Sequence, residues 1–542
     1  MTAASSASRG RRAGHDAIVV GAGHNGLVTA CYLARAGLRV LVLERRHVVG
    51  GACVTEETFP GFKVSTAAYV SSLFRPRIVR DLRLGEYGFE VLARSPSSFT
   101  PLPDGRSLTL GGDREQTRAE IAKFSARDAT RHGEYEAMLE RIAALVEPTL
   151  DMTPPDLLRP GPRGLLRLLG LGRAFARLGD GASEAVEVLT GPARTILDRW
   201  FESEPLKATL ATDAIIGAMA SPSTPGTGYV LFHHVMGETG GRRGVWGYVR
   251  GGMGGLTQAL ARAARDLGVE IRCEAPVARI VVRDGRVSGV VLESGEECRA
   301  RIVASNADAQ VTFLRLLAPE TLPPAFRAAV ARICYESASL KINVALAELP
   351  RFTAGSGGVP GPEHRTTIHV CPDLDYIERA YDEAKYGRPS ERPVLECTIP
   401  SVVDPTVAPP GRHLMSIFVQ YAPYALRGTT WDRLGEAFAD RCFALLDEYA
   451  PNFSRSVLGR QVLTPPDLER VFGLTGGNIF QGAMTPGQLF ALRPLPGHAG
   501  YRTPVRGLYL CGAAAHPGGG VMGAPGRNAA REILRSRRIF TT

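Results

Sequence analysis

A short segment near the N-terminus, Gly21-Ala22-Gly23-His24-Asn25-Gly26, constrains the fold of this chain more than any other feature. The apolar run from Asp16 to Val20 predicts a buried strand before it, and a helix and a second apolar strand are predicted after it. In such a turn the first glycine allows the tight bend, the second lets the backbone approach a pyrophosphate, and the third lets helix pack on strand. The helix N-terminus offers free N–H groups to the anion. The segment therefore predicts a dinucleotide-binding α/β unit.

The residues that follow narrow the choice of dinucleotide. Glu44 ends the second predicted strand, where an acid bonds the hydroxyls of an unphosphorylated ribose. This position disfavours NADP and leaves FAD and NAD. Gly50 and Gly51 come shortly afterwards and would let the backbone pass close to a large ligand a second time.

The stretch from Val19 to Thr55 resembles the N-terminal signature of the phytoene desaturase and amine oxidase flavoprotein superfamily. The resemblance implies FAD, with the acid at the adenosine ribose and the glycine pair along the diphosphate and ribityl. Ala52 stands where many members have arginine. The residues implied here in FAD binding are Gly21, Ala22, Gly23, His24, Asn25, Gly26, Glu44, Arg45, Gly50, Gly51 and Ala52.

The far end of the chain carries a second glycine-rich loop between a short apolar strand and a helix, within Gly507 to Leu534. Such a loop packs few side chains and lets the backbone approach a ligand. It resembles the C-terminal motif of phytoene desaturases, which implies closure over the flavin by Gly512, Ala513, Gly520, Val521 and Met522. The resemblance also implies adenine contact at Val277, a turn toward the cofactor at Asn306, and a place for His516 near the flavin ring. A structural role for His516 is equally open.

These pieces predict a Rossmann-type α/β FAD-binding domain that is discontinuous, with an α+β substrate domain of the phytoene desaturase and amine oxidase type. The FAD-binding domain is expected from residues 15–100, 240–330 and 495–535. The substrate domain, with its helical part and a layer of antiparallel strands, is expected from 101–239 and 331–494. Residues 1–14 are expected to form a disordered leader. Two stretches, Ser223–Glu238 and Leu474–Pro494, resemble one branch of the phytoene desaturase family.

Composition excludes several classes of function. The net charge is +10, but the basic residues are scattered and carry no nucleic-acid-binding signature. The nine cysteines include no Cys-x-x-Cys pair and no zinc spacing, so we expect no metal, no redox disulfide and a reducing, cytoplasmic compartment. A homo-oligomer is left open.

One segment of the helical part is unusual in its charge pattern. At helical spacing Arg163, Arg167, Arg173 and Arg177 fall on one side of residues 163–179, with leucines opposite. Such a helix either lies in a membrane interface or presents an arginine face to solvent above an apolar core. Three internal glycines weaken it. Peripheral membrane contact is therefore left open.

The expected activity is that of an FAD-dependent oxidoreductase of the dehydrogenase type, which desaturates or saturates a C–C bond of an apolar, isoprenoid- or lipid-like substrate. The cofactor carries the electron chemistry in such enzymes and the protein orients the substrate. Tyr229, His233 and His516 are the candidate catalytic residues. A flavin amine oxidase and a non-catalytic, lipid-associated FAD scaffold are the alternatives.

Overall fold

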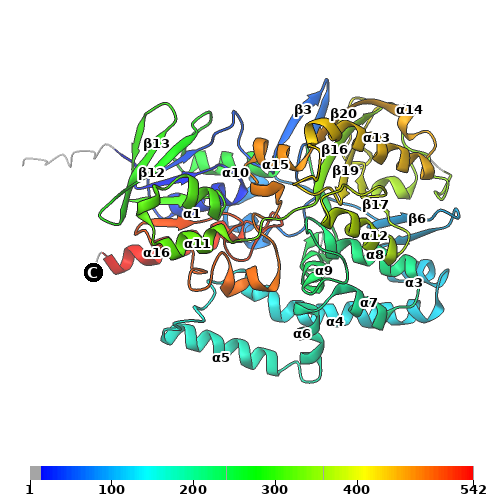
Figure 1. Ribbon diagram of the computed structural model, residues 1–542, viewed down its shortest axis with the longest axis horizontal. Coiled ribbons are helices and arrows are strands. Elements are labelled where there is room, and N and C mark those ends of the chain that lie inside the picture. The colour runs from blue at the N-terminus through cyan, green and yellow to red at the C-terminus, as the bar shows by residue number, and fades with distance from the viewer. Residues whose placement is uncertain (1–13, 240, 358, 541–542) are drawn as a thin grey trace, which may run out of the picture.

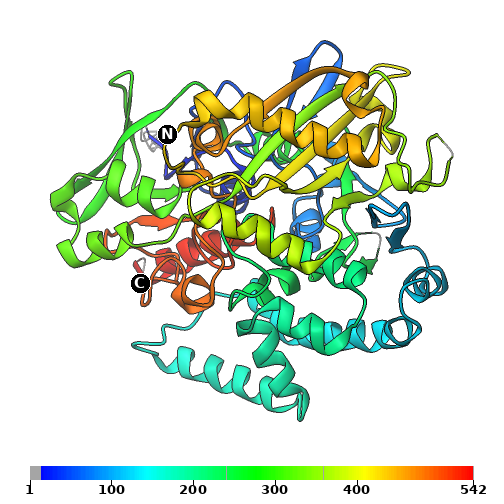
Figure 2. The ribbon, with the colours of Figure 1, turned by 45° about the vertical axis from the view of Figure 1, so that its right-hand side comes forward.

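The computed structural model describes residues 14–239, 241–357 and 359–540, so most of the expected leader lies outside the described residues. Two sheets dominate the molecule, and a lobe of helices lies beneath them (Figure 1). The smaller sheet lies beside both ends of the described chain, and the larger sheet lies on the opposite side. Figure 2 shows the same separation from a second direction.

The smaller sheet has five strands in the order β11-β2-β1-β15-β21, all paired in parallel. Helices α1, α10 and α16 pack beside it, with α16 against α1. Because β1, β2, β15 and β21 are largely apolar and buried and helices cover them, these strands form the centre of the largest core, whereas the edge strand β11 carries two charged residues. The bounds are β1 Ala17–Val20, β2 Val40–Leu43, β11 Glu270–Arg272, β15 Ile302–Ser305, β21 Leu508–Leu510, α1 His24–Arg35, α10 Gly254–Asp266 and α16 Ala524–Phe540.

A three-stranded antiparallel sheet extends from this domain, built from β12 (Val277–Arg283), β13 (Arg286–Leu292) and β14 (Glu297–Arg299). The turn between β12 and β13 is Asp284-Gly285, and both residues have positive φ, 49° and 68°. That geometry matches the twist of a two-residue hairpin.

The larger sheet has seven strands in the order β20-β16-β19-β18-β17-β6-β7. We expected antiparallel strands, but this sheet is mixed, because β6 enters from the N-terminal part of the chain and pairs with β17 in parallel. Helix α13 (Trp431–Tyr449) covers its apolar face. The strands are β6 Ser98–Pro101, β7 Ser107–Leu110, β16 Ser339–Leu346, β17 Thr367–Val370, β18 Val394–Thr398, β19 His413–Gln420 and β20 Val457–Leu463.

The helical lobe forms a second large core beneath the other face of this sheet. Helix α5 differs from the rest, since none of its residues is buried and it lies at the margin of the molecule in both views (Figures 1 and 2). The lobe contains α3 Arg114–Ala122, α4 Ala126–Leu150, α5 Pro162–Ala176, α6 Gly181–Thr190, α7 Ala193–Trp200, α8 Glu204–Ile215, α9 Thr227–Val235 and α12 Leu374–Lys385.

Shorter elements connect these parts. They are α2 Pro76–Asp81, α11 Pro324–Ala331, α14 Phe453–Ser456, α15 Pro465–Phe472 and the strand pairs β3 Thr55–Phe59 with β4 Phe62–Ser65, β5 Val91–Ala93 with β10 Gly247–Val249, and β8 Glu238–Thr239 with β9 Arg242–Arg243. Within the described ranges, no helix combines the length and apolar character needed to cross a membrane. All nine cysteines are free.

Candidate functional site

The turn between β1 and α1 is held at a separation that only glycine permits. Gly21 has φ of 93°, and a Cβ on Gly26 would lie 2.2 Å from the Gly21 carbonyl oxygen. A Cβ on Gly23 would lie 2.7 Å from Nδ2 of Asn306. The absence of side chains therefore brings α1 close to β1 and opens the backbone of the turn.

Glu44 and the glycine pair close one side of this turn. The Glu44 carboxylate accepts hydrogen bonds from the backbone N–H of Ala22 at 2.8 Å and of Arg46 at 3.0 Å. Gly50 forms a parallel bridge with Gly23, and its N–H donates to the Ala22 carbonyl. Two glycine-rich segments thus lie side by side at the carboxyl ends of β1 and β2, where α/β sheets bind their ligands.

The C-terminal loop meets the same point from the other side. A Cβ on Gly512, just after β21, would lie 2.5 Å from the carbonyl oxygen of Asn306, which follows β15. Gly520 has φ of 100°, and Val521 has φ of 57°, a conformation that β-branched residues adopt only under constraint. This strained backbone lies just before α16, within the C-terminal glycine-rich loop.

These residues fit FAD. No side chain caps the N-terminus of α1, and neither α1 nor α16 has an acidic residue in its first turn, so both ends remain suited to a phosphate. The buried Oδ1 atom of Asn25 has no hydrogen-bonding partner. The Glu44 carboxylate stands where ribose hydroxyls would bind.

Other predicted cofactor residues lie around this centre in different roles. The segment before Val277 hydrogen-bonds the backbone of Glu44, which places the start of β12 beside the acid. Ala52 packs against a small apolar cluster around Leu463. The Arg45 guanidinium instead donates to the carbonyls at the end of α15.

Three more predicted cofactor residues are buried or bonded within the protein. Burial lowers the pKa of His24 to about 4. The Ala513 carbonyl accepts a hydrogen bond from Nε of Arg493 at 2.9 Å. Met522 is buried, and its carbonyl accepts from the Arg75 N–H.

Of the three candidate catalytic residues, His233 lies against the C-terminal loop and Tyr229 lies beside His233. His233, on α9, is fully buried, and neither ring nitrogen has a partner in full hydrogen-bonding geometry, although the Gly519 backbone is near enough to raise its pKa. A Cβ on Gly520 would lie 2.9 Å from its Nε2. The Tyr229 ring lies 6.0 Å from the His233 ring, centroid to centroid. Burial, and then the neighbouring His234, lower the pKa of His233 to about 3, so the imidazole is neutral.

His516 makes a structural contact. Its Nε2 lies 2.8 Å from the carbonyl oxygen of Thr149 at the end of α4, and its ring packs edge-on against Phe490. Burial lowers its pKa to about 4. The imidazole is thus neutral and tied to the helical lobe, and this arrangement favours the structural role over a proton-transfer role.

A buried polar layer, which was not predicted from the sequence, lies on the face of the seven-stranded sheet opposite α13. Lys341, Phe418, Glu396 and His369 follow one another across β16, β19, β18 and β17 in register. Helix α8 covers this face: Thr209 hydrogen-bonds Thr100 at 2.7 Å, and the Gln420 side chain donates to the Ile215 carbonyl. The signal was the alternation Ser339, Lys341, Asn343 with apolar residues between them.

The layer contains buried ionisable side chains. Burial lowers the pKa of Lys341 to about 7 and raises that of Asp213, on α8, to about 7. Burial also raises the pKa of Glu396, which accepts a hydrogen bond from the Tyr69 hydroxyl. The Lys341 ammonium donates to Ser416 and lies 3.9 Å from the Tyr69 ring centroid.

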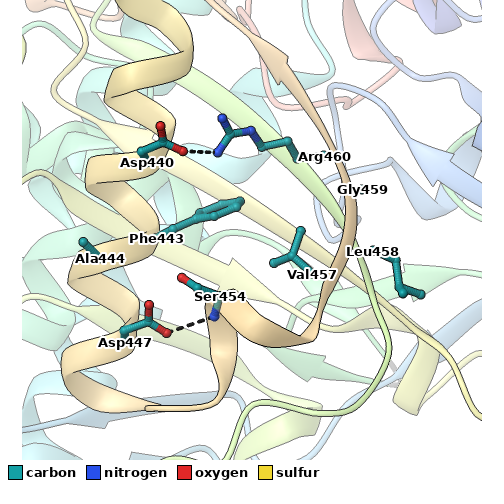
Figure 3. Close-up of a pocket in the computed structure, with 9 residues that line it drawn as sticks. All are labelled: Asp440, Phe443, Ala444, Asp447, Ser454, Val457, Leu458, Gly459 and Arg460. Carbon is teal, nitrogen blue, oxygen red and sulfur yellow. Dashed lines mark hydrogen bonds and ion pairs between the residues drawn. The ribbon is translucent and has the colours of Figure 1, made fainter.

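A surface pocket of about 510 Å³ lies elsewhere, between α13 and β20 (Figure 3). Its acids are already used: Asp440 pairs with Arg460, and Asp447 accepts from the Ser454 N–H at 2.9 Å. The apolar core of the sheet separates it from the polar layer. None of the predicted site residues lines it. Among the described residues, no group of three His, Cys, Asp or Glu side chains is arranged to hold a metal.

Comparison with known proteins identifies the protein family to which this chain belongs. The chain belongs to the family described as flavin containing amine oxidoreductase, whose model matches residues 26–367. It is 51% identical to pyridine nucleotide-disulfide oxidoreductase domain-containing protein 2 of Rattus norvegicus, over 96% of this chain and 93% of the relative. That similarity confirms the predicted branch, and the flavoprotein fold is confirmed with it.

More distant relatives carry names that describe a reaction. One subunit of the limonene dehydrogenase of Castellaniella defragrans is 29% identical over 96% of this chain and 94% of its own. A phytoene desaturase (lycopene-forming) of Pseudescherichia vulneris is 26% identical over 93% of this chain and 96% of its own. Cyclohexylamine oxidase from Brevibacterium oxydans shares the fold, with a TM-score of 0.59 and 17% identity over 98% of this chain and 100% of that one.

Proposed function

We propose that this protein is an FAD-dependent dehydrogenase that removes hydride from, or returns it to, a carbon of an apolar, isoprenoid- or lipid-like substrate. The observation that carries the proposal is the meeting of two glycine-rich loops, from opposite ends of the chain, at Asn306. FAD, when bound there, supplies the hydride acceptor. The names of the limonene and phytoene relatives, which describe isoprenoid hydrocarbons, support the substrate class.

The protein's own residues have three tasks in this proposal. The α1 turn and Glu44 hold the cofactor, the loop around Gly520 and Val521 closes over it, and α9 with the seven-stranded sheet forms the wall on the substrate side. His233 is neutral and unpartnered at that wall, so we assign it to substrate or cofactor contact rather than to proton storage.

An amine oxidase remains the second enzymatic candidate, supported by the family model and by the shared fold with cyclohexylamine oxidase. At 17% identity the fold does not carry substrate preference. A non-catalytic FAD scaffold is the third candidate.

The test is the visible absorption spectrum of the purified protein, followed by release of the cofactor by heat. We expect near-stoichiometric FAD, and anaerobic bleaching of the flavin by an isoprenoid or lipid donor but not by primary amines. Bleaching by amines alone would favour the amine oxidase, and a flavin that no donor reduces would favour the scaffold. A colourless protein that FAD cannot load contradicts all three.

We also propose that α5 delivers this substrate from an anionic lipid surface. Its leucines Leu165, Leu166 and Leu169 are 50%, 69% and 57% exposed, so the apolar core expected beneath the arginine face is absent. Residues 157–179 contain arginines and no acid, which suits anionic headgroups.

A further inference from the structure

Arg94 is a buried cation without an anion. Its side chain lies in the polar layer, and the residue is 6% exposed. Among the described residues, no carboxylate oxygen lies within 4.0 Å of a guanidinium nitrogen of Arg94, the distance that defines an ion pair. Its Nε donates to the Trp246 carbonyl at 2.7 Å and its Nη1 donates to Oγ1 of Thr367. A guanidinium has five N–H donors, so donors remain.

Arg493 shows how this chain satisfies a buried guanidinium when the role is structural. That residue is 2% exposed, and its Nε, Nη1 and Nη2 all donate to backbone carbonyls, among them those of Ala513 and Phe480. Arg94 has no such set, since no hydrogen bond of its Nη2 to a backbone carbonyl occurs in the described part of the chain. An unpaired buried charge is costly, so the difference points to a missing partner.

Three buried polar atoms without a partner in hydrogen-bonding geometry lie on the groups around Arg94: the Tyr248 hydroxyl, Thr398 Oγ1 and His369 Nδ1. The Tyr248 ring centroid lies 5.5 Å from the guanidinium carbon, and its hydroxyl is close to both Arg94 and Thr398. Thr398 is the register partner of Thr367, which binds Arg94, and His369 is two residues further along the same strand face. The Tyr248 and Thr398 hydroxyls lie close to each other and to Arg94 without full hydrogen-bonding geometry, and a ligand with several acceptor positions would satisfy them together with His369.

The carboxylates of the polar layer do not act as the anionic partner of Arg94. Glu396 is engaged by Tyr69, and Asp213 lies on α8. Burial raises the pKa of both, attraction to Arg94 lowers it in each case, and neither carboxylate lies within 4.0 Å of the guanidinium among the described residues. Lys341 is held by Ser416 and Tyr69. The positive charge of Arg94 is therefore available to pair with an anionic group of a bound ligand.

We propose that Arg94, with Tyr248, Thr398 and His369, binds the carboxylate of the substrate, which makes the substrate class a lipophilic carboxylic acid. Arginine suits this group because its planar fork matches both carboxylate oxygens. The inference rests on the proposed function, in which the rest of the substrate is apolar.

The test is calorimetric titration of the FAD-loaded protein with octanoic, dodecanoic and oleic acids and with the alcohols of the same chains. We expect at least one acid to bind, and its alcohol to bind at least about tenfold more weakly, since hydrogen bonds to a charged group are worth about 1.5–3 kcal/mol. Arg94→Gln should weaken binding of the acid by about a hundredfold. The matched control Arg392→Gln, in an exposed ion pair with Glu448, should not change it.

Two further variants keep the test independent of folding. Tyr248→Phe and Thr398→Val each remove a hydroxyl that has no partner in hydrogen-bonding geometry in the free protein, so thermal stability should not fall. Each should weaken binding of the acid by about tenfold. Equal binding of acid and alcohol, no binding of any acid, or unchanged affinity in these variants overturns the inference.

Flavin absorption recorded on the same samples separates the two proposals. A flavoprotein that ignores carboxylates overturns the carboxylate site alone. A protein that cannot hold FAD but binds an acid through Arg94 contradicts the proposed function and supports the site.

Discussion

At the scale of single residues, the contact between Gly26 and the Gly21 carbonyl decides how closely α1 approaches β1. No other residue type fits the 2.2 Å left for a Cβ. Gly26 could be identified from the sequence because a glycine at this spacing in the motif is needed for close packing of the helix on the strand.

The first prediction follows from that contact. Gly26→Ala should lose most bound FAD and destabilise the protein by about 1–3 kcal/mol, because backbone must shift to admit the methyl group. The measurements are flavin absorption per protein and thermal unfolding. Gly172→Ala, in α5 with no atom within 4 Å of the added Cβ, is the control and should be neutral or slightly stabilising. Full flavin content in Gly26→Ala would contradict the proposed cradle.

Other site residues could not be assigned from their positions in the sequence. Arg45 follows the acid directly, yet its guanidinium goes to α15, more than four hundred positions away along the chain. Arg94 carries no motif at all. Its importance appears only when β10 and two strands of the larger sheet surround it, which no local pattern encodes.

At the scale of elements, α5 is the clearest departure from an ordinary globular helix. Its amphipathic pattern was evident in the sequence, but the pattern was equally consistent with a core-facing helix. Only the exposure of the whole helix, visible in Figures 1 and 2, separates the two cases.

The second prediction tests α5. The triple variant Arg163→Gln, Arg173→Gln and Arg177→Gln should abolish co-sedimentation with vesicles containing phosphatidylserine and leave the flavin spectrum unchanged, because each basic residue contributes about 1 kcal/mol at an anionic surface. Arg167 is kept because it donates to the Thr153 carbonyl. A control with the same change of charge, Arg332→Gln, Arg388→Gln and Arg455→Gln at other exposed positions, should still bind.

Unaltered vesicle binding by the α5 variant would exclude the helix as the lipid contact. No binding by the wild type, together with a dimer in solution that Leu166→Asp dissolves, would assign the exposed leucines to a second copy instead.

The strands also show the difference between features with a local signal in the sequence and features that depend on distant residues. The hairpin of β12 and β13 turns at Asp284-Gly285, and such a two-residue turn is a local signal in the sequence. The parallel pairing of β6 with β17 joins residues far apart in sequence and has no local signal.

At the scale of the whole molecule, buried histidines couple stability to pH. Burial lowers the pKa of His233 and His369 to about 3 and that of His516 to about 4, against an ordinary value of 6.5. The unfolded chain takes up these protons below pH 6.5 and the folded chain does not. The stability that these histidines contribute is therefore fully present above that pH and falls as the pH drops toward about 4.

The third prediction is that each such histidine lowers the free energy of unfolding by about 1.4 kcal/mol per pH unit between about pH 6.5 and about pH 5, while the raised pKa of Asp213 and of Glu396 acts in the opposite direction. His233→Leu should reduce that slope by about this amount. Urea unfolding at several pH values measures it. Identical slopes in the variant and the wild type would show that His233 does not titrate between the two states in this way.

The sequence by itself determined the parts whose meaning is local: the Gly21–Gly26 turn with its flanking strand and helix, the acid at Glu44, the Asp284-Gly285 hairpin and the C-terminal glycine loop. Each is specified by backbone geometry within a few residues. Only the tertiary structure decided that both glycine loops meet at Asn306, that His516 binds α4, that α5 stands exposed, and that a polar layer with an unpaired Arg94 lies beneath α8. These outcomes depend on which distant faces are buried together, because burial removes a strand lysine or a loop arginine from water and leaves its charge to be balanced by the groups around it.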